Sequence, residues 1–140
     1  MAVSLNPYLN FRGQARAAME FYQSVLGGEL TVTTFAEFGI SDDPAEKDNL
    51  MHAQLRTPLG MTLMGADVPA QMDFAPGNTF YVSLSGDDAT ELTRYWEGLS
   101  ESAKIDEPLT AAPWGDSFGM LTDRFGVQWM VNIAGTEAAT

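Results

Sequence analysis

The sequence predicts one order of elements twice, and this repeat is the feature that most constrains the fold. Each half reads as strand, helix, strand, strand, strand, first over residues 3–67 and again over residues 78–134. A four-stranded sheet with one helix on its outer face still has a second face to cover, and two such sheets can curl toward each other. We therefore expect an α+β protein in which two βαβββ modules form curled mixed sheets around a cleft, within a single domain of residues 1–140.

Spacing locates the main difference between the two halves. Gly27 and Leu99 end the predicted helices and lie 72 positions apart, whereas the hairpin glycines Gly60 and Gly126 lie 66 apart. The first half must therefore carry a longer loop, and its glycine, proline and acidic residues place that loop at 39–48. Few residues are identical between the halves, so the repeat lies in the pattern.

The first module is read from the period of its apolar residues. Leu5, Leu9 and Phe11 share one face of a first strand, and Gly13 separates that strand from a segment with helical spacing. In the third strand, the apolar stripe is Met51, Ala53 and Leu55. The expected elements are strands at 5–11, 29–38, 50–57 and 61–66 and a helix at 14–26.

The second module ends in a hairpin. Asp123 can accept hydrogen bonds from the backbone ahead of it and Gly126 can take a positive φ, so these residues bound a turn. Apolar residues alternate beyond the turn and place Trp129 in the core beneath a helix. Asp88 with Glu91 forms a capping box for that helix. The expected elements are strands at 79–85, 104–110, 117–122 and 127–133 and a helix that ends at Leu99.

Composition narrows the choice of partners. Nineteen acidic residues against seven basic ones give a net charge of −12, which repels phosphate backbones, so we expect no nucleic-acid partner. No apolar run approaches the roughly 18 residues of a membrane-spanning helix, and no charged-then-apolar leader follows Met1, so we expect no membrane association. The absence of cysteine excludes thiolate catalysis. It also fits a reducing compartment, so we expect a cytoplasmic protein.

Short motifs spread over nearly the whole chain resemble those of a known superfamily. They are Pro7-Tyr8-Leu9-Asn10-Phe11, Phe21-Tyr22, Leu26-Gly27-Gly28, His52-Ala53-Gln54-Leu55, Trp114-Gly115-Asp116, Asp123-Arg124-Phe125-Gly126 and Trp129. With them the sequence resembles the PhnB-like branch of the vicinal oxygen chelate superfamily, which includes glyoxalases, extradiol dioxygenases and bleomycin-resistance proteins. The resemblance implies the same paired-module fold. Members of this branch are often named demethylubiquinone methyltransferases, but the sequence has no glycine-rich strand-to-helix loop suited to a nucleotide cofactor.

The resemblance also indicates where a metal would bind. The metal enzymes of the superfamily hold a divalent ion with His and Glu side chains, at positions that correspond to the neighbourhood of Asn6, Gln54, Tyr81 and Met130. None of these residues is His or Glu, and a single histidine excludes the two histidines and carboxylate of an iron dioxygenase. A nickel or zinc site of the glyoxalase type is nearly as poorly supplied. We therefore expect no metal cofactor.

Strand alternation gives these positions another use. Tyr81, for example, lies opposite the apolar stripe of Phe80, Val82 and Leu84, where it can face a ligand. Amide and phenol groups supply hydrogen bonds, and Met130 supplies a soft apolar contact, as a pocket for an organic molecule needs. The expected ligand-binding residues are Asn6, Tyr8, His52, Gln54, Tyr81, Trp114 and Met130.

Alternatives remain open at several residues. His52, the one candidate for catalysis, could be a general base that titrates near neutrality, or an ordinary lining or surface histidine. Trp114 could stack on a ring or a cation at the mouth of the cleft, or belong to a turn in which Asp116 accepts backbone hydrogen bonds. Arg12 and Arg56 could meet an anionic ligand or make exposed salt bridges.

The leading hypothesis is a metal-free protein that binds a small organic molecule without transforming it. A homodimer is expected as well, because small open sheets leave edges to protect. The alternative is a lyase or isomerase in the same cleft, which uses His52 or a divalent metal held by oxygen ligands. A third possibility is a protein-interaction role in which the protein's own side chains fill the cleft. The sequence does not identify the ligand or the reaction.

Overall fold

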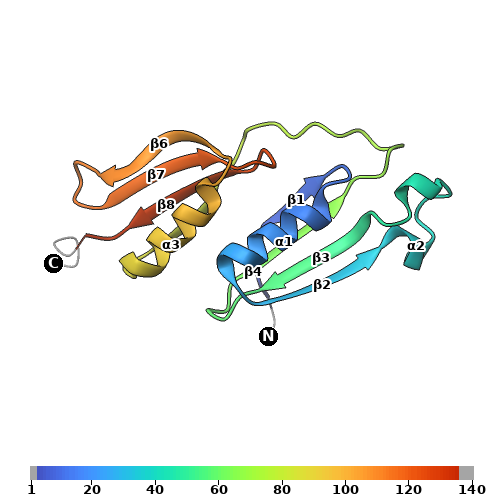
Figure 1. Cartoon of the computed structure of the whole chain (residues 1–140), viewed down its shortest axis with the longest axis horizontal. Coiled ribbons are helices and arrows are strands. Elements are labelled where there is room, and N and C mark those ends of the chain that lie inside the picture. The colour runs from blue at the N-terminus through green and yellow to red at the C-terminus, as the bar shows by residue number, and fades with distance from the viewer. Residues whose placement is uncertain (1–2, 136–140) are drawn as a thin grey trace. The chain divides into compact units, whose positions relative to one another are not determined.

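The computed structural model describes residues 3–135 of the 140-residue chain. The chain divides into two compact units, with unit 1 ending at Gly77 and unit 2 beginning at Asn78. Each unit contains one four-stranded sheet and one long helix (Figure 1). No helix among the described residues is long and apolar enough to span a bilayer. The expected α+β class with two four-stranded mixed sheets is confirmed, whereas the single domain of residues 1–140 stays a prediction.

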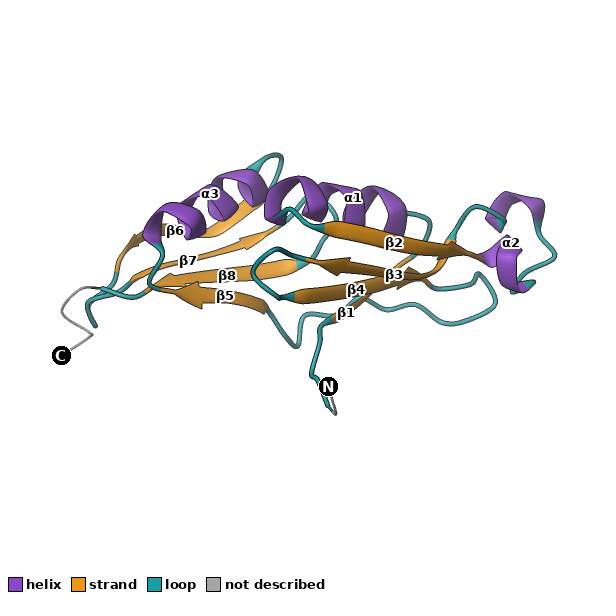
Figure 2. Ribbon diagram, turned by 90° about the horizontal axis from the view of Figure 1, so that it is seen from below, coloured by secondary structure: helices purple, strands orange, loops and turns teal. Residues whose placement is uncertain are grey.

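Unit 1 follows the predicted order of one strand, one helix and three strands. Its main elements are β1 (Tyr8–Phe11), α1 (Ala15–Leu26), β2 (Glu29–Thr34), β3 (Leu50–Arg56) and β4 (Thr62–Asp67). The strands lie side by side in the order β1-β4-β3-β2, with β1 parallel to β4 and the other pairs antiparallel. Helix α1 covers one face of this sheet (Figure 2).

Helix α1 buries the side that the apolar spacing predicts. Its buried residues are Ala15, Ala18, Met19, Tyr22, Val25 and Leu26. Burial of a large side chain such as Met19 or Tyr22 contributes roughly 1.5–3 kcal/mol. Leu9, Phe11 and Leu55 are buried in the sheet. Because strand side chains alternate, the intervening residues lie on the sheet face turned away from α1.

Asp67 joins three parts of unit 1. It is the last residue of β4 and is only 5% exposed, although the strand predicted at 61–66 stops one residue before it. Its Oδ1 accepts hydrogen bonds from the Gly13 and Ala15 N–H groups at 2.7 and 3.0 Å, and its Oδ2 accepts one from the Leu50 N–H at 2.9 Å. The carboxylate therefore caps the start of α1 and also fixes the start of β3.

The first strand is shorter than predicted, and the expected apolar face for Leu5 is wrong. Leu5 is 100% exposed, and β1 begins only at Tyr8. This strand has β4 as its single partner, and their pairing begins at Tyr8 and Met64. Pro7 has no N–H to extend the ladder, although its carbonyl accepts a bond from the Met64 N–H.

The second strand also ends earlier than predicted. Its residues 35–38 form a short helix, α2 (Phe35–Phe38), because the Thr34 hydroxyl caps it by accepting from the Glu37 N–H. The predicted loop at 39–48 contains a single 3-10 turn, η1 (Pro44–Glu46), capped by Asp43.

A bulge changes the predicted face of β3. His52 pairs with Thr33, but Leu50 pairs with Thr34, so Met51 has no partner residue in the register. Leu50 is consequently buried and Met51 is half-buried, the reverse of the predicted assignment. The predicted alternation holds for the rest of the strand.

Unit 2 repeats the architecture of unit 1. Its elements are β5 (Val82–Gly86), α3 (Ala89–Ser100), β6 (Lys104–Ala111), β7 (Ser117–Thr122) and β8 (Gln128–Ile133). The strand order is β5-β8-β7-β6, with β5 parallel to β8. Pro108 lies in β6, at the edge of the sheet, where strands tolerate proline.

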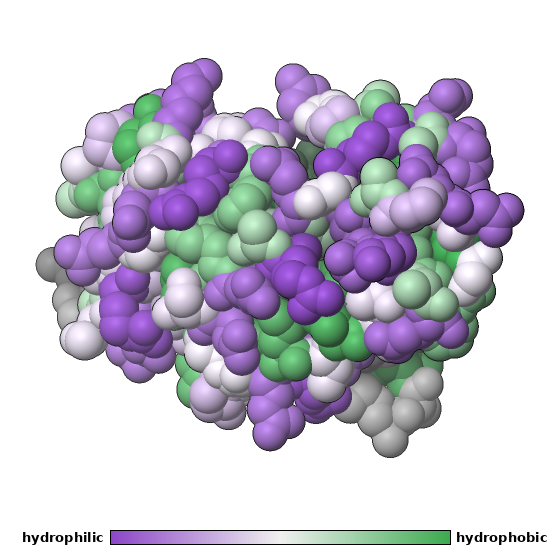
Figure 3. Space-filling view, turned by 45° about the vertical axis from the view of Figure 1, so that its right-hand side comes forward, coloured by the Kyte–Doolittle hydropathy of each residue, from purple (hydrophilic) through white to green (hydrophobic). Residues whose placement is uncertain are grey.

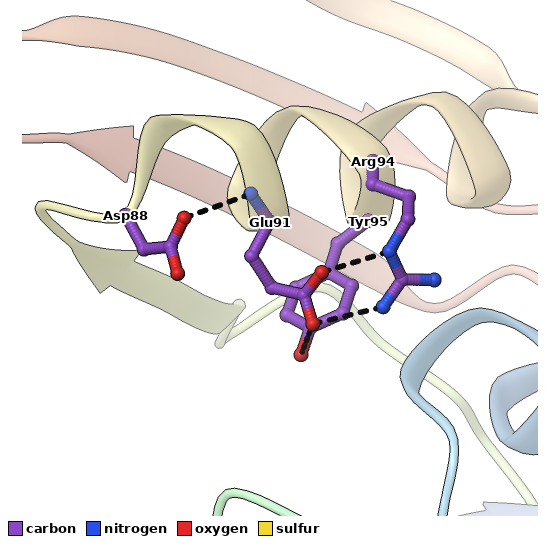
Figure 4. A network of polar contacts seen from close by, with 4 residues as sticks. All are labelled: Asp88, Glu91, Arg94 and Tyr95. Carbon is purple, nitrogen blue, oxygen red and sulfur yellow. Dashed lines mark hydrogen bonds and ion pairs between the residues drawn. The ribbon is translucent and has the colours of Figure 1, made fainter.

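Residues of its own first turn cap α3 (Figure 4). Asp88 accepts a hydrogen bond from the Glu91 N–H at 3.1 Å, which is one half of the predicted capping box. The other half is not formed among the described residues, because the Glu91 carboxylate accepts from Arg94 and Tyr95 and not from the Asp88 N–H. Glu91 in turn accepts two hydrogen bonds from Arg94 and one from the Tyr95 hydroxyl. Arg94 holds the pKa of Glu91 below its usual value. The start of α3 is therefore stabilised by side chains close in sequence.

The hairpin of β7 and β8 contains the second buried aspartate. Oδ1 of Asp123 accepts from the N–H groups of Phe125 and Val127, and Oδ2 accepts from Nε1 of Trp129 at 2.9 Å. Gly126 has a φ of 88°, as the predicted turn requires. Trp129 is 1% exposed, so its predicted core position is confirmed.

The strand predicted at 79–85 is β5, which begins three residues later than predicted, at Val82. Phe80 is 55% exposed, so its predicted place in the apolar stripe is wrong. The partner strand β8 itself begins only at Gln128, and the pairing starts at Val82 and Trp129. Tyr81 therefore precedes the strand.

Candidate functional site

A row of side chains crosses the sheet of unit 1 on the face turned away from α1. Tyr8 on β1 pairs with Met64 on β4, Met64 pairs with Gln54 on β3, and Gln54 pairs with Thr31 on β2. Met64 and Gln54 are half-buried, Thr31 is exposed, and Tyr8 is 44% exposed. This row places a phenol, a thioether, an amide and a hydroxyl side by side across the four strands.

His52 lies beside this row on β3 and contacts Tyr8. The Tyr8 hydroxyl is 3.1 Å from Nδ1 of His52, and the ring centroids are 5.7 Å apart. Burial raises the pKa of the Tyr8 phenol, so this hydroxyl keeps its proton beyond the ordinary range. The contact joins two predicted site residues that are 44 positions apart in sequence.

The charged groups next to this face are few. Arg56 follows Gln54 by two residues on β3, and the register places Glu29 opposite it. Arg56 makes no ion pair or side-chain hydrogen bond within residues 3–135. Arg12 donates to the carbonyls of Pro69 and Met72 and lies over the Phe74 ring, so these contacts tie it to the connector that follows β4, residues 68–77. Figure 3 shows hydrophilic residues interspersed with hydrophobic ones on one side of the molecule.

Unit 2 has a corresponding row with different chemistry. Met130 on β8 pairs with Ser83 on β5 and with Met120 on β7. Asn132 and Phe118 form the next pair along these strands. Glu107 on β6 pairs with Met120 and ends the row, so this row holds two thioethers, one hydroxyl and one carboxylate.

Trp114 packs beside this second row. Its ring meets Phe118 edge-on at 5.9 Å between centroids, and the side chain is 61% exposed. Oδ2 of Asp116 accepts a hydrogen bond from the Asn132 side chain at 2.9 Å, and Oδ1 accepts one from the Gly135 N–H at 3.0 Å. These two hydrogen bonds hold the pKa of Asp116 below its usual value. Asp116 thus accepts one backbone hydrogen bond, as predicted, but from Gly135 beyond β8 rather than from its own turn. Trp114 is an exposed aromatic residue on this turn, and its stacking on a ligand stays a prediction.

The structure brings some of the predicted site residues together and separates others. Tyr8, His52 and Gln54 share one sheet face of unit 1. Asn6 precedes β1, and its amide donates to the Ser4 hydroxyl. Tyr81, Trp114 and Met130 belong to unit 2. A cleft between the two modules stays a prediction.

The four positions expected for metal ligands do not suit a divalent ion. They offer two amides, one phenol and one thioether, and none of the imidazole or carboxylate groups that such ions favour. Among residues 3–135, no group of three or more His, Asp or Glu side chains could hold a metal ion. The donor groups at these positions therefore do not fit the metal that the superfamily resemblance implies.

The starts of the two long helices are already occupied by carboxylates. Helix N-termini commonly bind the anionic groups of cofactors through free N–H groups. At α1 the Gly13 and Ala15 N–H groups donate to Asp67, and at α3 the Glu91 N–H donates to Asp88. A ligand is therefore better served by the side chains of the sheets than by these helix ends.

Several residues of the two rows are not among the expected ligand-binding residues. Met64, Met120, Phe118 and Asn132 lie opposite the buried residues of their strands, so alternation alone could have found them. The contact between Tyr8 and His52 had no sequence signal, because it depends on how β1 and β3 flank β4.

Comparisons with known proteins agree with this architecture. A family model described as 3-demethylubiquinone-9 3-methyltransferase matches residues 3–132. Protein YjdN from Escherichia coli (strain K12) is 31% identical over 140 residues, covering 92% of this chain and 94% of that protein. The crystal structure of protein PA1353 from Pseudomonas aeruginosa is 37% identical, with a TM-score of 0.80, and the match covers 96% of this chain and 99% of that one.

More distant structures share the fold. A putative 3-demethylubiquinone-9 3-methyltransferase, PhnB protein, from Bacillus cereus is 23% identical with a TM-score of 0.70, covering 94% of this chain and 100% of that chain. Solved proteins described as glyoxalase, bleomycin resistance protein or dioxygenase also match, at 15% and 14% identity with TM-scores of 0.64 and 0.62. At such identities the likeness concerns the fold alone.

Proposed function

This chain belongs to the family described as 3-demethylubiquinone-9 3-methyltransferase, in the PhnB-like part of the vicinal oxygen chelate superfamily, and from this premise we propose that it binds a small organic molecule. Binding occurs on the sheet faces turned away from the helices, without a metal ion. The family description does not identify the physiological ligand.

The observation that carries this proposal is the row of Tyr8, Met64, Gln54 and Thr31. A site for an organic molecule combines apolar surface with a few hydrogen-bonding groups that set orientation. The row supplies both, and regular strands hold its backbone in register, so little ordering is needed when a ligand binds. The corresponding row in unit 2 contains Met130, and the exposed ring of Trp114 lies beside it, so unit 2 by itself offers a second, partly apolar surface.

The methyltransferase activity in the family description is not part of this proposal. The strand-to-helix segments at Gly13 and Gly86 each contain one glycine rather than a glycine-rich loop. The N–H groups that an anionic cofactor would use at Gly13 and Ala15 bind Asp67. We further propose that the protein forms a homodimer, because its sheets have edge strands that a second copy would cover. We also propose that it acts in the cytoplasm, since a chain without cysteine fits a reducing compartment.

A second candidate function is a lyase or isomerase centred on His52 or on a divalent metal. The contact between Tyr8 and His52 favours the His52 version, since a hydrogen bond from a neighbouring hydroxyl orients an imidazole for proton transfer. Elemental analysis of chelator-free protein tests the metal version, and a stoichiometric nickel, zinc or iron content would overturn the metal-free proposal.

A thermal-shift screen tests binding. Aromatic, cationic and dicarbonyl metabolites are added singly to the wild type and to the Gln54→Ala and Gln71→Ala variants. Binding is supported when a compound raises the melting temperature of the wild type and of Gln71→Ala but not of Gln54→Ala. Gln71 is an exposed connector residue without a side-chain hydrogen bond in the described residues, so it is the matched control. Stabilisation by divalent ions alone would contradict the proposal.

A further inference from the structure

We propose that Tyr8 is a positioning residue that holds neutral His52 in the tautomer with its proton on Nε2, so that this face binds an oxygen acceptor of its ligand. The acceptor is the oxygen of a carbonyl or carboxylate group. The statement about the ligand rests on the proposed function, whereas the statement about the tautomer does not.

The geometry of the pair is set by the sheet. Tyr8 and His52 extend from β1 and β3, which flank β4, and their 3.1 Å contact joins the phenol oxygen to Nδ1. The rings also meet at 5.7 Å with an angle of 37° between their planes. Because the register of all three strands is fixed by backbone pairing, the contact does not depend on a mobile loop.

The direction of this hydrogen bond follows from its chemistry. A neutral imidazole has one nitrogen that donates and one that accepts, and a phenol is a good donor to the accepting nitrogen. Burial keeps the Tyr8 phenol protonated by raising its pKa, which maintains it as the donor. With Nδ1 accepting, the proton of neutral His52 lies on Nε2. Nε2 has no hydrogen-bond partner within residues 3–135, so this donor is available.

Neighbouring groups on β3 reinforce the preference for an acceptor. His52, Gln54 and Arg56 alternate along one face and span roughly 13 Å at about 3.3 Å per residue. Each presents an N–H donor, and Arg56 adds a positive charge that no described carboxylate pairs with. The titratable residues of this face also include Tyr8 and Glu29, and Glu29 lies opposite Arg56 at the far end from His52. A ligand oxygen at His52 therefore meets donors rather than acids.

The tautomer can be read directly, because His52 is the only histidine in the chain. Protein labelled with ¹⁵N in histidine gives ring signals from one residue. At a pH where His52 is neutral, we expect a protonated Nε2 and a hydrogen-bonded, unprotonated Nδ1 in the wild type. In Tyr8→Phe the Nδ1 signal should move toward that of an imidazole nitrogen without a donor. Tyr95→Phe removes a phenol hydroxyl from α3 and should leave the spectrum unchanged.

The outcomes are decisive even if a variant folds poorly. A protonated Nδ1 in the wild type would overturn the assignment without any variant. An Nδ1 signal that is the same in the wild type and in folded Tyr8→Phe would also overturn it, because the hydroxyl would then have no effect on the ring.

The ligand class is tested by titration with benzoate, acetophenone and benzylamine. Benzoate and acetophenone carry an oxygen acceptor and should shift the Nε2 signal of the wild type, with at least a threefold weaker apparent affinity in Tyr8→Phe. Benzylamine carries only donors when protonated and should leave Nε2 unchanged. A response to benzylamine alone, or to none of the three, would contradict the acceptor preference. A thermal-shift ligand that lacks an acceptor would contradict it too, yet would leave the proposed binding function standing.

Discussion

The two units build the same fold but place their buried carboxylates differently. Met64 in unit 1 is equivalent to Met130 in unit 2, because each lies four residues after the glycine of its hairpin, Gly60 or Gly126, and pairs with the first and third strands of its sheet. Three residues further on, Asp67 of unit 1 therefore corresponds to Ile133 of unit 2. Asp67 caps α1 from a distance, whereas α3 uses Asp88 next to it in sequence.

The hairpins show the reverse arrangement. Thr57 and Asp123 hold equivalent positions, and both turns make the same backbone bonds, with Gly60 and Gly126 donating to Thr57 and Asp123. Thr57 adds one side-chain hydrogen bond, to the Met61 N–H, whereas Asp123 adds three. The backbone pattern is thus repeated while the main polar anchor has moved, to the end of β4 in unit 1 and to the β7–β8 turn in unit 2.

The largest expected effect is that of Asp67→Ala. It leaves three backbone N–H groups without their acceptor, and we expect a loss of roughly 3–5 kcal/mol in the stability of unit 1. Hydrogen exchange of amides in α1 and β3 should quicken. All three tryptophans lie in unit 2, so their fluorescence monitors that unit alone. An equal loss in both units would show that the anchor is not local to unit 1.

Asp123→Ala should have the next largest effect, this time in unit 2. The indole of Trp129 and two turn N–H groups lose their acceptor, at a cost of roughly 2–4 kcal/mol. Urea unfolding followed by tryptophan fluorescence measures it. The matched change in unit 1, Thr57→Ala, removes one side-chain bond and should cost about 1 kcal/mol by hydrogen exchange. Similar losses at both turns would contradict the contrast between the two hairpins.

Asp88→Ala removes an exposed cap. The loss should be about 1 kcal/mol, since an N-cap residue satisfies only one N–H group at the helix start. The same fluorescence experiment detects it. A cost as large as that of Asp67→Ala would mean that exposure does not distinguish the two caps.

A local cap should partly replace the remote one. Gln14 is the N-cap residue of α1 and makes no side-chain cap bond. Adding Gln14→Asp to Asp67→Ala should recover about 0.5–1 kcal/mol in α1, because only the helix N–H groups, and not that of Leu50, gain an acceptor. Hydrogen exchange that slows again in α1 but stays fast in β3 would match this expectation. Complete recovery in both elements would refute it.

The smallest expected effect concerns acid pH. Because the folded-state pKa of Glu91 is lowered, its contribution is present above the ordinary value near 4.5 and disappears as the pH falls through the folded value. Glu91→Gln should therefore lower the stability of unit 2 slightly at pH 7 and not at pH 3. Screening by solvent keeps the effect small. A larger difference at pH 3 than at pH 7 would reverse the sign.

The parts of the fold that local pattern determines could be predicted. The apolar spacing of α1, the N-cap at Asp88 and the turn at Asp123 each depend on residues within a few positions. Errors arose where a partner strand decides the outcome. Leu5 and Phe80 fit an apolar stripe, but β4 and β8 give no pairing at those positions. The bulge opposite Met51 likewise arises from pairing with β2.

The candidate site could be predicted in the same partial way. Alternation places Gln54 and Met130 on the sheet faces that the structure gives them, because period two survives wherever a strand is regular. The hydrogen bond between Tyr8 and His52 and the remote capping by Asp67 could not be inferred, since each joins residues more than 40 positions apart. Patterns within a few residues do not indicate which distant residues will meet.

The remote cap also sets an order of events as the chain emerges during synthesis. α1 is complete in sequence by Leu26, yet the acceptor for its first N–H groups arrives with Asp67, after three further strands. A nascent chain that ends before Asp67 must hold α1 without this bond, and a helix of that length is marginal alone in water. α3 needs no such wait, because Asp88 precedes it.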